Sequence, residues 1–261
     1  MAFTDSHAHL DDARFDADLP AVLERARAAG VERILTIAGG TSAEELSRAV
    51  KLAEAHSHIW AAVGVHPHEA RHATDGLLAA LGELARSPRV LAWGEIGLDY
   101  HYDHSPREEQ GEAFRRQLQS ARALRLPVII HCREAWEDCL AILGEEWAAS
   151  GLGGILHCFS GDAGVARRAL DWGFLISFAG NVTFPRAQNL RAVAREIPLD
   201  HVLVETDCPY LAPQAVRGKR NEPAFVVETA AVLGRLHSLS GEEIGARTAE
   251  NFLRLFPRAA G

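Results

Sequence analysis

Lysine is nearly absent from this sequence: Lys51 and Lys219 are the only two, and arginine supplies the remaining positive side chains. Acidic residues outnumber basic ones, 35 to 27, and the formal net charge is −8. A chain with this charge has no general positive field that would attract nucleic acid. A polyanionic substrate must therefore be held by a local group of arginines or by bound metal.

Long apolar runs are also missing. No stretch approaches the roughly 18 apolar residues that a membrane-spanning helix needs, so we expect no membrane contact. No basic segment followed by an apolar one opens the chain, so we expect no secretory signal and a cytoplasmic location. We infer no obligate protein partner. The four cysteines form no CxxC pair and are most simply buried small residues, although Cys132, Cys158 and Cys208 each follow a candidate ligand.

Apolar, β-branched segments alternate with segments of helical periodicity along the whole chain. Strand–helix units repeated about every 25–35 residues predict an α/β fold, a (β/α)8 TIM barrel in a single domain of residues 1–261. An open doubly wound sheet is the alternative, but its glycine fingerprint is absent after the first strand. We expect strands at 3–5, 32–37, 60–65, 90–95, 128–131, 154–157, 174–177 and 201–205. We expect helices near 17–29, 43–55, 77–86, 108–124, 135–148, 164–172 and 189–196, with a last one at 242–256 closing the barrel floor or side.

Side chains that bind metals stand at the ends of five of these strands. His7 and His9 are two residues apart, so in an extended segment they point to the same side. The carboxyl ends of the strands of a parallel barrel open on one face, where active sites lie. Four histidines and two carboxylates are therefore expected to converge there: His7, His9, Glu95, His131, His157 and Asp207.

Nitrogen and oxygen ligands of this kind suit zinc, manganese, iron or magnesium. Six exceed what one ion needs if water and substrate also bind, so two ions sharing a bridging carboxylate are the simplest interpretation. Any one of these buried-strand histidines alone would more simply be a core residue bonded to the backbone. Four at matching strand ends, beside carboxylates, favour a binuclear metal site at the barrel mouth.

Six motifs span the chain: Thr4–His9, Gly64–His68, Gly94–Tyr100, His157–Gly161, Glu205–Pro213 and Arg220–Pro223. In these motifs and in their order the sequence resembles the TatD family of metal-dependent deoxyribonucleases, within the amidohydrolase-like metal barrels. Cysteine follows three functional positions where serine is frequent in the family, a nearly isosteric change.

The resemblance also implies how the ligands divide. Some relatives in the wider group bridge their metals with a carboxylated lysine after the fourth strand, but neither lysine of this chain lies there. Glu95 is then left as the bridging carboxylate. By the resemblance, one ion is bound by His7, His9, Glu95 and Asp207, and the second by Glu95, His131 and His157.

Two further residues are expected to bind substrate at the barrel mouth. His66 follows the third strand and Arg133 the fifth, and a guanidinium offers a planar fork that matches phosphate oxygens. The alternatives are a core position or a contact with a metal ligand for His66, and an ion pair with Glu134 or Asp138 for Arg133. The basic residues at 217–220 form either a solvated loop or a groove for a nucleic-acid backbone.

With the resemblance, these residues predict a hydrolase that uses two divalent ions (Mg, Mn or Zn) to cleave DNA phosphodiester bonds. It would be a 3′–5′ exodeoxyribonuclease acting on single-stranded or damaged DNA, in DNA repair. Asp207 is the expected general base, and Glu205 is the second candidate, either as base or as a partner of the water or of a ligand. One alternative is an ester or amide hydrolase on the same site, such as a D-aminoacyl-tRNA deacylase. Another is a non-catalytic nucleic-acid-binding protein, which should have lost a ligand position; none is lost.

Overall fold

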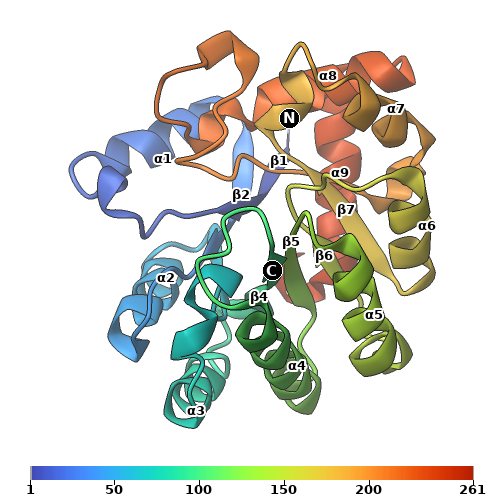
Figure 1. Cartoon of the computed structure of the whole chain (residues 1–261). Helices are drawn as coiled ribbons and strands as arrows, with labels where there is room; N and C mark the ends of the chain where they lie inside the picture. Colours follow the sequence, from blue (N-terminus) through green and yellow to red (C-terminus); the bar gives the residue numbers. More distant parts are fainter. Residues whose placement is uncertain (1, 261) are drawn as a thin grey trace.

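Eight parallel strands, hydrogen-bonded in chain order, form one sheet that curves into a barrel (Figure 1). The computed structural model describes residues 2–260. Helices surround the sheet, so the fold is the single-domain (β/α)8 barrel that the sequence predicts. The strands are β1 (Phe3–Ala8), β2 (Val31–Ile37), β3 (Ile59–Val63), β4 (Val90–Asp99), β5 (Val128–Arg133), β6 (Gly154–Leu156), β7 (Phe174–Phe178) and β8 (Val202–Val204).

The barrel closes between β1 and the segment that follows β8. Ala8 forms a parallel bridge with Cys208. The backbone N–H of His9 donates to the carbonyl of Cys208 at 2.8 Å, and that of Asp207 donates to the carbonyl of His7 at 2.9 Å. Closure therefore brings together candidate ligands from the two ends of the chain.

Seven helices connect successive strands, and two more follow β8. Capping residues define several of them; Ser42, for example, forms a capping box with Glu45 at the start of α2. The helices are α1 (Leu19–Ala28), α2 (Ala43–Ala55), α3 (Asp75–Leu84), α4 (Arg107–Leu124), α5 (Trp136–Glu146), α6 (Ala163–Asp171), α7 (Gln188–Glu196), α8 (Val226–His237) and α9 (Gly241–Leu255).

Helix α8 is absent from the sequence prediction, and that omission is wrong. Its buried positions Val226, Ala230, Leu233 and Gly234 follow the i, i+4, i+7 and i+8 spacing of one helix face, and Val232 is buried outside that face. The helical spacing of apolar residues was therefore present in the sequence of this segment.

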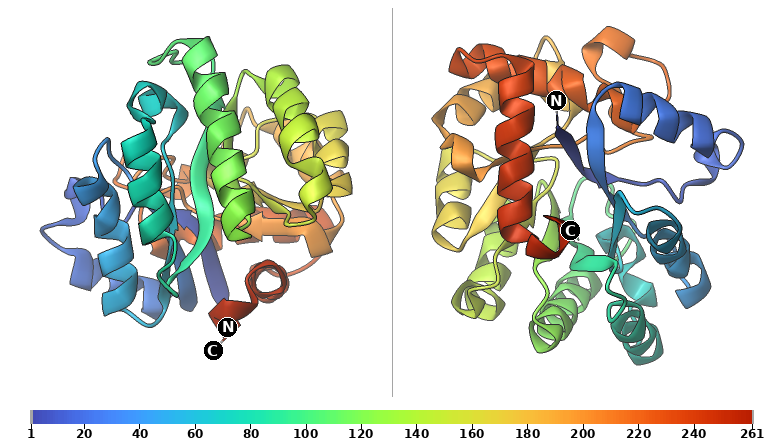
Figure 2. Two further views of the ribbon diagram at one scale, coloured as in Figure 1. Left: turned by 90° about the horizontal axis from the view of Figure 1, so that it is seen from below. Right: turned by 180° about the vertical axis from the view of Figure 1, so that it is seen from behind.

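Helix α9 closes the barrel floor, as the sequence predicts for its tail. Figure 2 (right) shows α9, in red, across the face opposite to that seen in Figure 1. Its Phe252, together with Phe256 just beyond its end, packs among inward-facing side chains of β2 to β8, such as Leu35 and Ile129. This end of the barrel is therefore filled by apolar side chains, and the polar residues gather at the other end.

The largest errors in the predicted strand ends are those of β1 and β4, and both concern the site. Strand β1 does not end at Asp5 but continues to Ala8, because Ala8 pairs with Thr36 of β2. Strand β4 runs to Asp99 rather than Glu95, because its last residues pair with β5 through to Arg133. Longer strands hold His7 and Glu95 within the sheet itself.

None of the helices formed by residues 2–260 combines the length and the apolar character needed to cross a bilayer.

Candidate metal centre

A pocket of about 890 Å³ opens at the carboxyl ends of the strands, the end of the barrel that faces the viewer in Figure 1. Most of the residues predicted for the site line it. His7 and Glu205 are fully buried and lie behind the pocket wall. The predicted residues that line the pocket are His9, His66, Glu95, His131, Arg133, His157 and Asp207.

One group of donor atoms comes from β1, β4 and the segment after β8. The Nε2 of His7 lies 3.3 Å from the Nε2 of His9 and 3.3 Å from Oε2 of Glu95. Oδ1 of Asp207 lies 3.4 Å from the Nε2 of His9 and 3.7 Å from that of His7. The Nε2 of His9 lies 3.8 Å from Oε2 of Glu95. His7, His9 and Glu95 thus bring one donor atom each within 4.8 Å of one another, and Asp207 adds an oxygen beside both histidines.

These separations fit a shared cation. All of them exceed the range of about 2.7–3.2 Å that a good N–H···O bond prefers. A tetrahedral ion with bonds of about 2.0–2.1 Å holds neighbouring ligand atoms about 3.3–3.4 Å apart. Two imidazole nitrogens and two carboxylate oxygens in such an arrangement form a donor set suited to zinc or manganese.

The other oxygen of Glu95 faces a second group. Oε1 of Glu95 lies 2.8 Å from Nδ1 of His131 and 2.7 Å from Nε2 of His157. These two nitrogens are 3.2 Å apart. Glu95 therefore presents one oxygen to each group, the geometry required of a bridging carboxylate.

Buried carboxylates hold the outer nitrogens of both histidines in the second group. Oε1 of Glu205 lies 3.2 Å from Nδ1 of His157 and accepts the backbone N–H of Cys158 at 2.7 Å. Oδ2 of Asp99 lies 3.0 Å from Nε2 of His131. A carboxylate in this position fixes the tautomer and ring orientation of a ligating histidine and raises its basicity.

Asp99 lies in the Gly94–Tyr100 motif, but the sequence pattern predicted no role for it in the site. It ends β4 four residues beyond Glu95, so period-two alternation places both on the same side of the strand. Because the sequence prediction ended this strand at Glu95, the alternation did not predict that Asp99 faces the site.

The sequence model of the family described as TatD related DNase matches residues 4–257 of this chain. The chain belongs to this family. The chain and its relatives are thus metal-dependent hydrolases. The histidine and carboxylate groups around Glu95 agree with this, because they could hold a metal ion.

The similarity to individual relatives extends over almost the whole length of both chains. The chain is 46% identical to the uncharacterized metal-dependent hydrolase YabD of Bacillus subtilis, over 97% of this chain and 98% of the relative. It is 39% identical to the 3′-5′ ssDNA/RNA exonuclease TatD of Cronobacter turicensis, over 97% of each chain. The crystal structure of YJJV, a TatD homologue from Escherichia coli K12, superposes with a TM-score of 0.90 at 34% identity, covering 98% of each chain.

Charge in this TatD-family site is concentrated on its ionised carboxylates and histidines. Burial raises the pKa of Glu95, but His157, His66 and His7 together hold it well below its usual range. Burial lowers the pKa of His9, but the hydrogen bond and charge of Asp207 raise it to about 9. Without metal, the two donor groups are thus charged at neutral pH.

His66 contacts this site from the loop after β3. Its Nε2 lies 3.5 Å from Oε1 of Glu95, and its Nδ1 accepts the backbone N–H of His68 at 3.1 Å. Burial lowers the pKa of His66 to about 4, despite the opposing charge of Glu95. The ring is therefore neutral at pH 7 and acts through hydrogen bonds rather than charge.

Arg133 ends β5 at the pocket wall, and no carboxylate within residues 2–260 forms an ion pair with it. The partners expected for an ion pair are engaged elsewhere: Glu134 pairs with His101 at 2.8 Å, and Asp138 accepts the hydroxyl of Tyr100 at 2.7 Å. The guanidinium is thus available to an anion in the pocket.

The remaining basic and thiol groups near the site are either paired with other residues or buried. Arg220, from the basic residues at 217–220, donates to both carboxylate oxygens of Asp18, at 2.8 and 2.7 Å. Burial raises the pKa of the thiols of Cys132, Cys158 and Cys208, so none is poised to act as a nucleophile.

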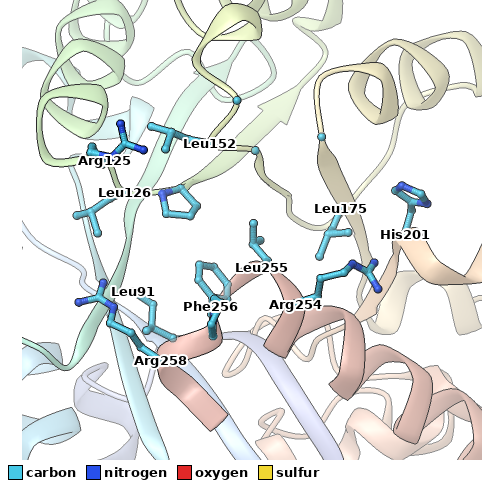
Figure 3. Close-up of a pocket in the computed structure, with 15 residues that line it drawn as sticks. Leu91, Arg125, Leu126, Leu152, Leu175, His201, Arg254, Leu255, Phe256 and Arg258 are labelled. Atoms are coloured by element: carbon cyan, nitrogen blue, oxygen red, sulfur yellow. The ribbon is translucent and has the colours of Figure 1, made fainter. Parts of the chain in front are cut away.

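A second hollow, of about 580 Å³, lies at the opposite end of the barrel (Figure 3). There the segments leading into β5, β6 and β7 meet the end of α9. Arg125, Arg254 and Arg258 surround a floor that includes Leu91 and Phe256 (Figure 3). It contains none of the six candidate ligands.

Proposed function

We propose that this protein hydrolyses phosphodiester bonds in DNA with two divalent ions, removing nucleotides from the 3′ end of single-stranded or damaged DNA. The observation that carries the proposal is the position of Glu95, whose two oxygens face two separate pairs of histidine nitrogens, 2.7–3.8 Å away. Arg133, which forms no ion pair with a carboxylate of residues 2–260, lies in the same pocket. The name of the Cronobacter relative, a 3′-5′ ssDNA/RNA exonuclease, supports the same substrate class.

The ligands divide as the two donor groups do. Glu95 would bridge the ions through its two oxygens. The first ion would be held by His7, His9, Glu95 and Asp207, and the second by Glu95, His131 and His157. When bound, such ions polarise phosphoryl oxygens and lower the pKa of water.

Side chains of the pocket would perform the remaining steps. The Arg133 guanidinium binds two oxygens of the scissile phosphate through its parallel N–H groups. Neutral His66 donates its Nε2 proton to a phosphate oxygen, since its Nδ1 already accepts a backbone N–H. Asp207, at the edge of the pocket, takes the proton of the attacking water at a carboxylate oxygen.

Glu205 fits the role of ligand partner better than that of general base. It is fully buried behind His157, and its Oε1 is engaged by His157 and by the backbone of Cys158. A base must reach a water in the pocket, and Asp207 lines the pocket whereas Glu205 does not. We assign Glu205 to the orientation of His157, as Asp99 orients His131.

A substrate panel tests the proposed reaction. Metal-free protein is refilled with Mg²⁺, Mn²⁺ or Zn²⁺ and given single-stranded DNA, RNA and a D-aminoacyl ester. The proposal predicts DNA cleavage that depends on added ion and is abolished by a chelator. Hydrolysis of the ester with DNA left intact would assign the site to the deacylase alternative. Binding of DNA without hydrolysis of any substrate would support the non-catalytic alternative.

The direction of attack needs a second assay. A strand labelled at its 5′ end should give labelled products that shorten by one nucleotide at a time, while a circular single strand survives. Rapid nicking of the circle would show that the site accepts internal phosphates and would contradict exonucleolytic cleavage.

A further inference from the structure

Two aromatic side chains are exposed at the mouth of the candidate metal centre. Among residues 2–260, Tyr102 and Tyr210 are the only large hydrophobic side chains that are exposed, at 52% and 48%. Both line the pocket that contains the candidate ligands. Exposed apolar surface that is confined to one pocket indicates a binding surface rather than ordinary surface variation. The third tyrosine, Tyr100, does not line the pocket, and its hydroxyl is bonded to Asp138.

Tyr102 is held in place from the loop after β4. Its backbone N–H donates to Oδ1 of Asp99 at 2.8 Å. Its ring lies parallel to that of His104, with centroids 5.5 Å apart, and meets the ring of His68 edge-on at 5.4 Å. The guanidinium carbon of Arg133 lies 4.8 Å from the ring centroid. The ring is thus fixed next to the predicted phosphate-binding arginine.

Tyr210 is held in place from the loop after β8. Its backbone N–H donates to the carbonyl of Asp207 at 2.9 Å, and its carbonyl accepts from the side chain of Asn221 at 2.6 Å. Its ring meets that of His9 edge-on at 5.8 Å, and the guanidinium carbon of Arg14 lies 4.3 Å from its centroid. This tyrosine therefore adjoins the first donor group, whereas Tyr102 adjoins Arg133 and the second.

We propose that Tyr102 and Tyr210 are stacking surfaces for the unpaired bases on the two sides of the scissile phosphate. The inference rests on the proposed function and adds to it the form of the substrate: a strand whose bases are free to leave their stack. Every base has a π-face, so stacking on tyrosine tolerates any sequence. Bases in a duplex have their faces covered by neighbouring pairs, so the site would select single strands through these rings.

Four variants test the inference in the metal-loaded protein: Tyr102→Ala, Tyr210→Ala, Tyr102→Phe and Tyr210→Phe. Each alanine variant should lower kcat/KM on single-stranded DNA by about 5- to 150-fold, the equivalent of about 1–3 kcal/mol for one stacked base. The phenylalanine variants keep the ring and should retain activity close to that of the unaltered protein. Alanine variants that match the unaltered protein, or phenylalanine variants as impaired as alanine ones, would overturn the inference.

A strand without bases near its 3′ end separates stacking from structural damage. The unaltered protein should cleave this abasic strand poorly, and the alanine substitutions should have little further effect on it. An equal loss on the normal and the abasic strand would assign the tyrosines a structural role and overturn the inference. Trp172→Ala is the control, because Arg168 also lies over that ring, at 5.3 Å, but Trp172 does not line the pocket. This variant should leave the ratio of the two activities unchanged.

A binding assay makes failure of the inference distinguishable from failure of the proposed function. A fluorescent single-stranded peptide nucleic acid carries bases but has no phosphodiester bond to cleave. Its affinity, followed by anisotropy, should fall in both alanine variants and persist in both phenylalanine variants, whether or not the protein hydrolyses DNA. Equal affinity for all variants would overturn the inference even if DNA is cleaved. Absence of DNA cleavage together with the expected binding pattern would overturn only the proposed function.

Discussion

Oδ2 of Asp99 lies 3.0 Å from Nε2 of His131 and also 3.0 Å from Nε2 of His68. The backbone N–H groups of His101 and Tyr102 donate to the other oxygen, Oδ1. Burial raises the pKa of Asp99, but the hydrogen bonds from His131, from the backbone of Tyr102 and from His68 outweigh that effect and lower the pKa below its usual range. The ionised carboxylate therefore accepts a hydrogen bond from Nε2 of His131, which would leave Nδ1 as the ligand atom of a metal-bound His131.

We predict that Asp99→Asn weakens binding of the second ion by about 10- to 100-fold, the usual effect of losing a carboxylate that orients a ligating histidine. The amide of asparagine is neutral, so it accepts hydrogen bonds from His131 and His68 more weakly than the carboxylate does. Stepwise calorimetric titration of metal-free protein with Mn²⁺ should show the first ion bound normally and the second more weakly. Asp138→Asn, an exposed carboxylate bonded to Tyr100, is the control and should change neither step. Unchanged binding of both ions to the Asp99 variant would contradict this role.

Metal affinity should increase as pH rises from about 6.5 to 9. His9, with a pKa of about 9, and His157, whose pKa Glu95 and Glu205 raise against the effect of burial, hold protons at neutral pH without metal. A ligating imidazole must be neutral, so each ion competes with these protons and releases them on binding. Calorimetry in buffers of different ionisation enthalpy measures that release. An affinity independent of pH, with no proton transferred to the buffer, would contradict the protonation states described here.

Asp207→Asn should lower kcat by about 10²- to 10⁴-fold, the usual range for loss of a general base. The amide keeps the shape of the side chain but removes its charge and its basic oxygen. Because Asp207 is also a proposed ligand, metal content must be measured in the same sample. Full activity with both ions bound would show that another group accepts the proton of the water.

Arg133→Ala should act mainly on KM, because the proposed contact of its guanidinium with phosphate oxygens would be the same in the ground state and in the transition state. The ions should remain bound, since Arg133 contacts no candidate ligand by hydrogen bond or ion pair within residues 2–260. Steady-state kinetics on DNA measure the change in KM. If a neutral ester is also hydrolysed, the substitution should have a smaller effect on it, because the ester has no phosphate. A KM for DNA equal to that of the unaltered protein would remove Arg133 from the phosphate site.

His66→Gln should make the metal-free protein less sensitive to acid. The pKa of His66 in the folded protein, about 4, lies below the ordinary value of 6.5. Its contribution to stability is therefore fully present above pH 6.5 and is lost as pH falls towards 4. Urea unfolding at several pH values should give a shallower loss of stability for the variant over this range. Equal slopes would indicate that His66 titrates normally in the folded protein.

Much of the fold and of the candidate site could be predicted from the sequence, because both follow local patterns. Strands such as β5 begin with a continuous apolar run, which a residue able to bind metal, here His131, follows. The parallel barrel brings the carboxyl ends of its strands to one face. Asp99 and the tyrosines could not be found in this way. Contact between Asp99 and His131 depends on the register of β4 against β5, and the exposure of Tyr102 and Tyr210 depends on how distant loops pack. The DNA substrate, the number and identity of the ions and the cytoplasmic location stay predictions.

The central claim is that cleavage of DNA requires two ions bridged by Glu95, and a single titration tests it directly. Metal-free protein at a concentration well above the dissociation constants receives Mn²⁺ in steps, while cleavage of an end-labelled single strand is followed at each step. We predict little cleavage up to one ion per chain, a steep rise as the second binds, and a plateau at two. Full activity at one ion per chain, or no cleavage at two, would contradict the account.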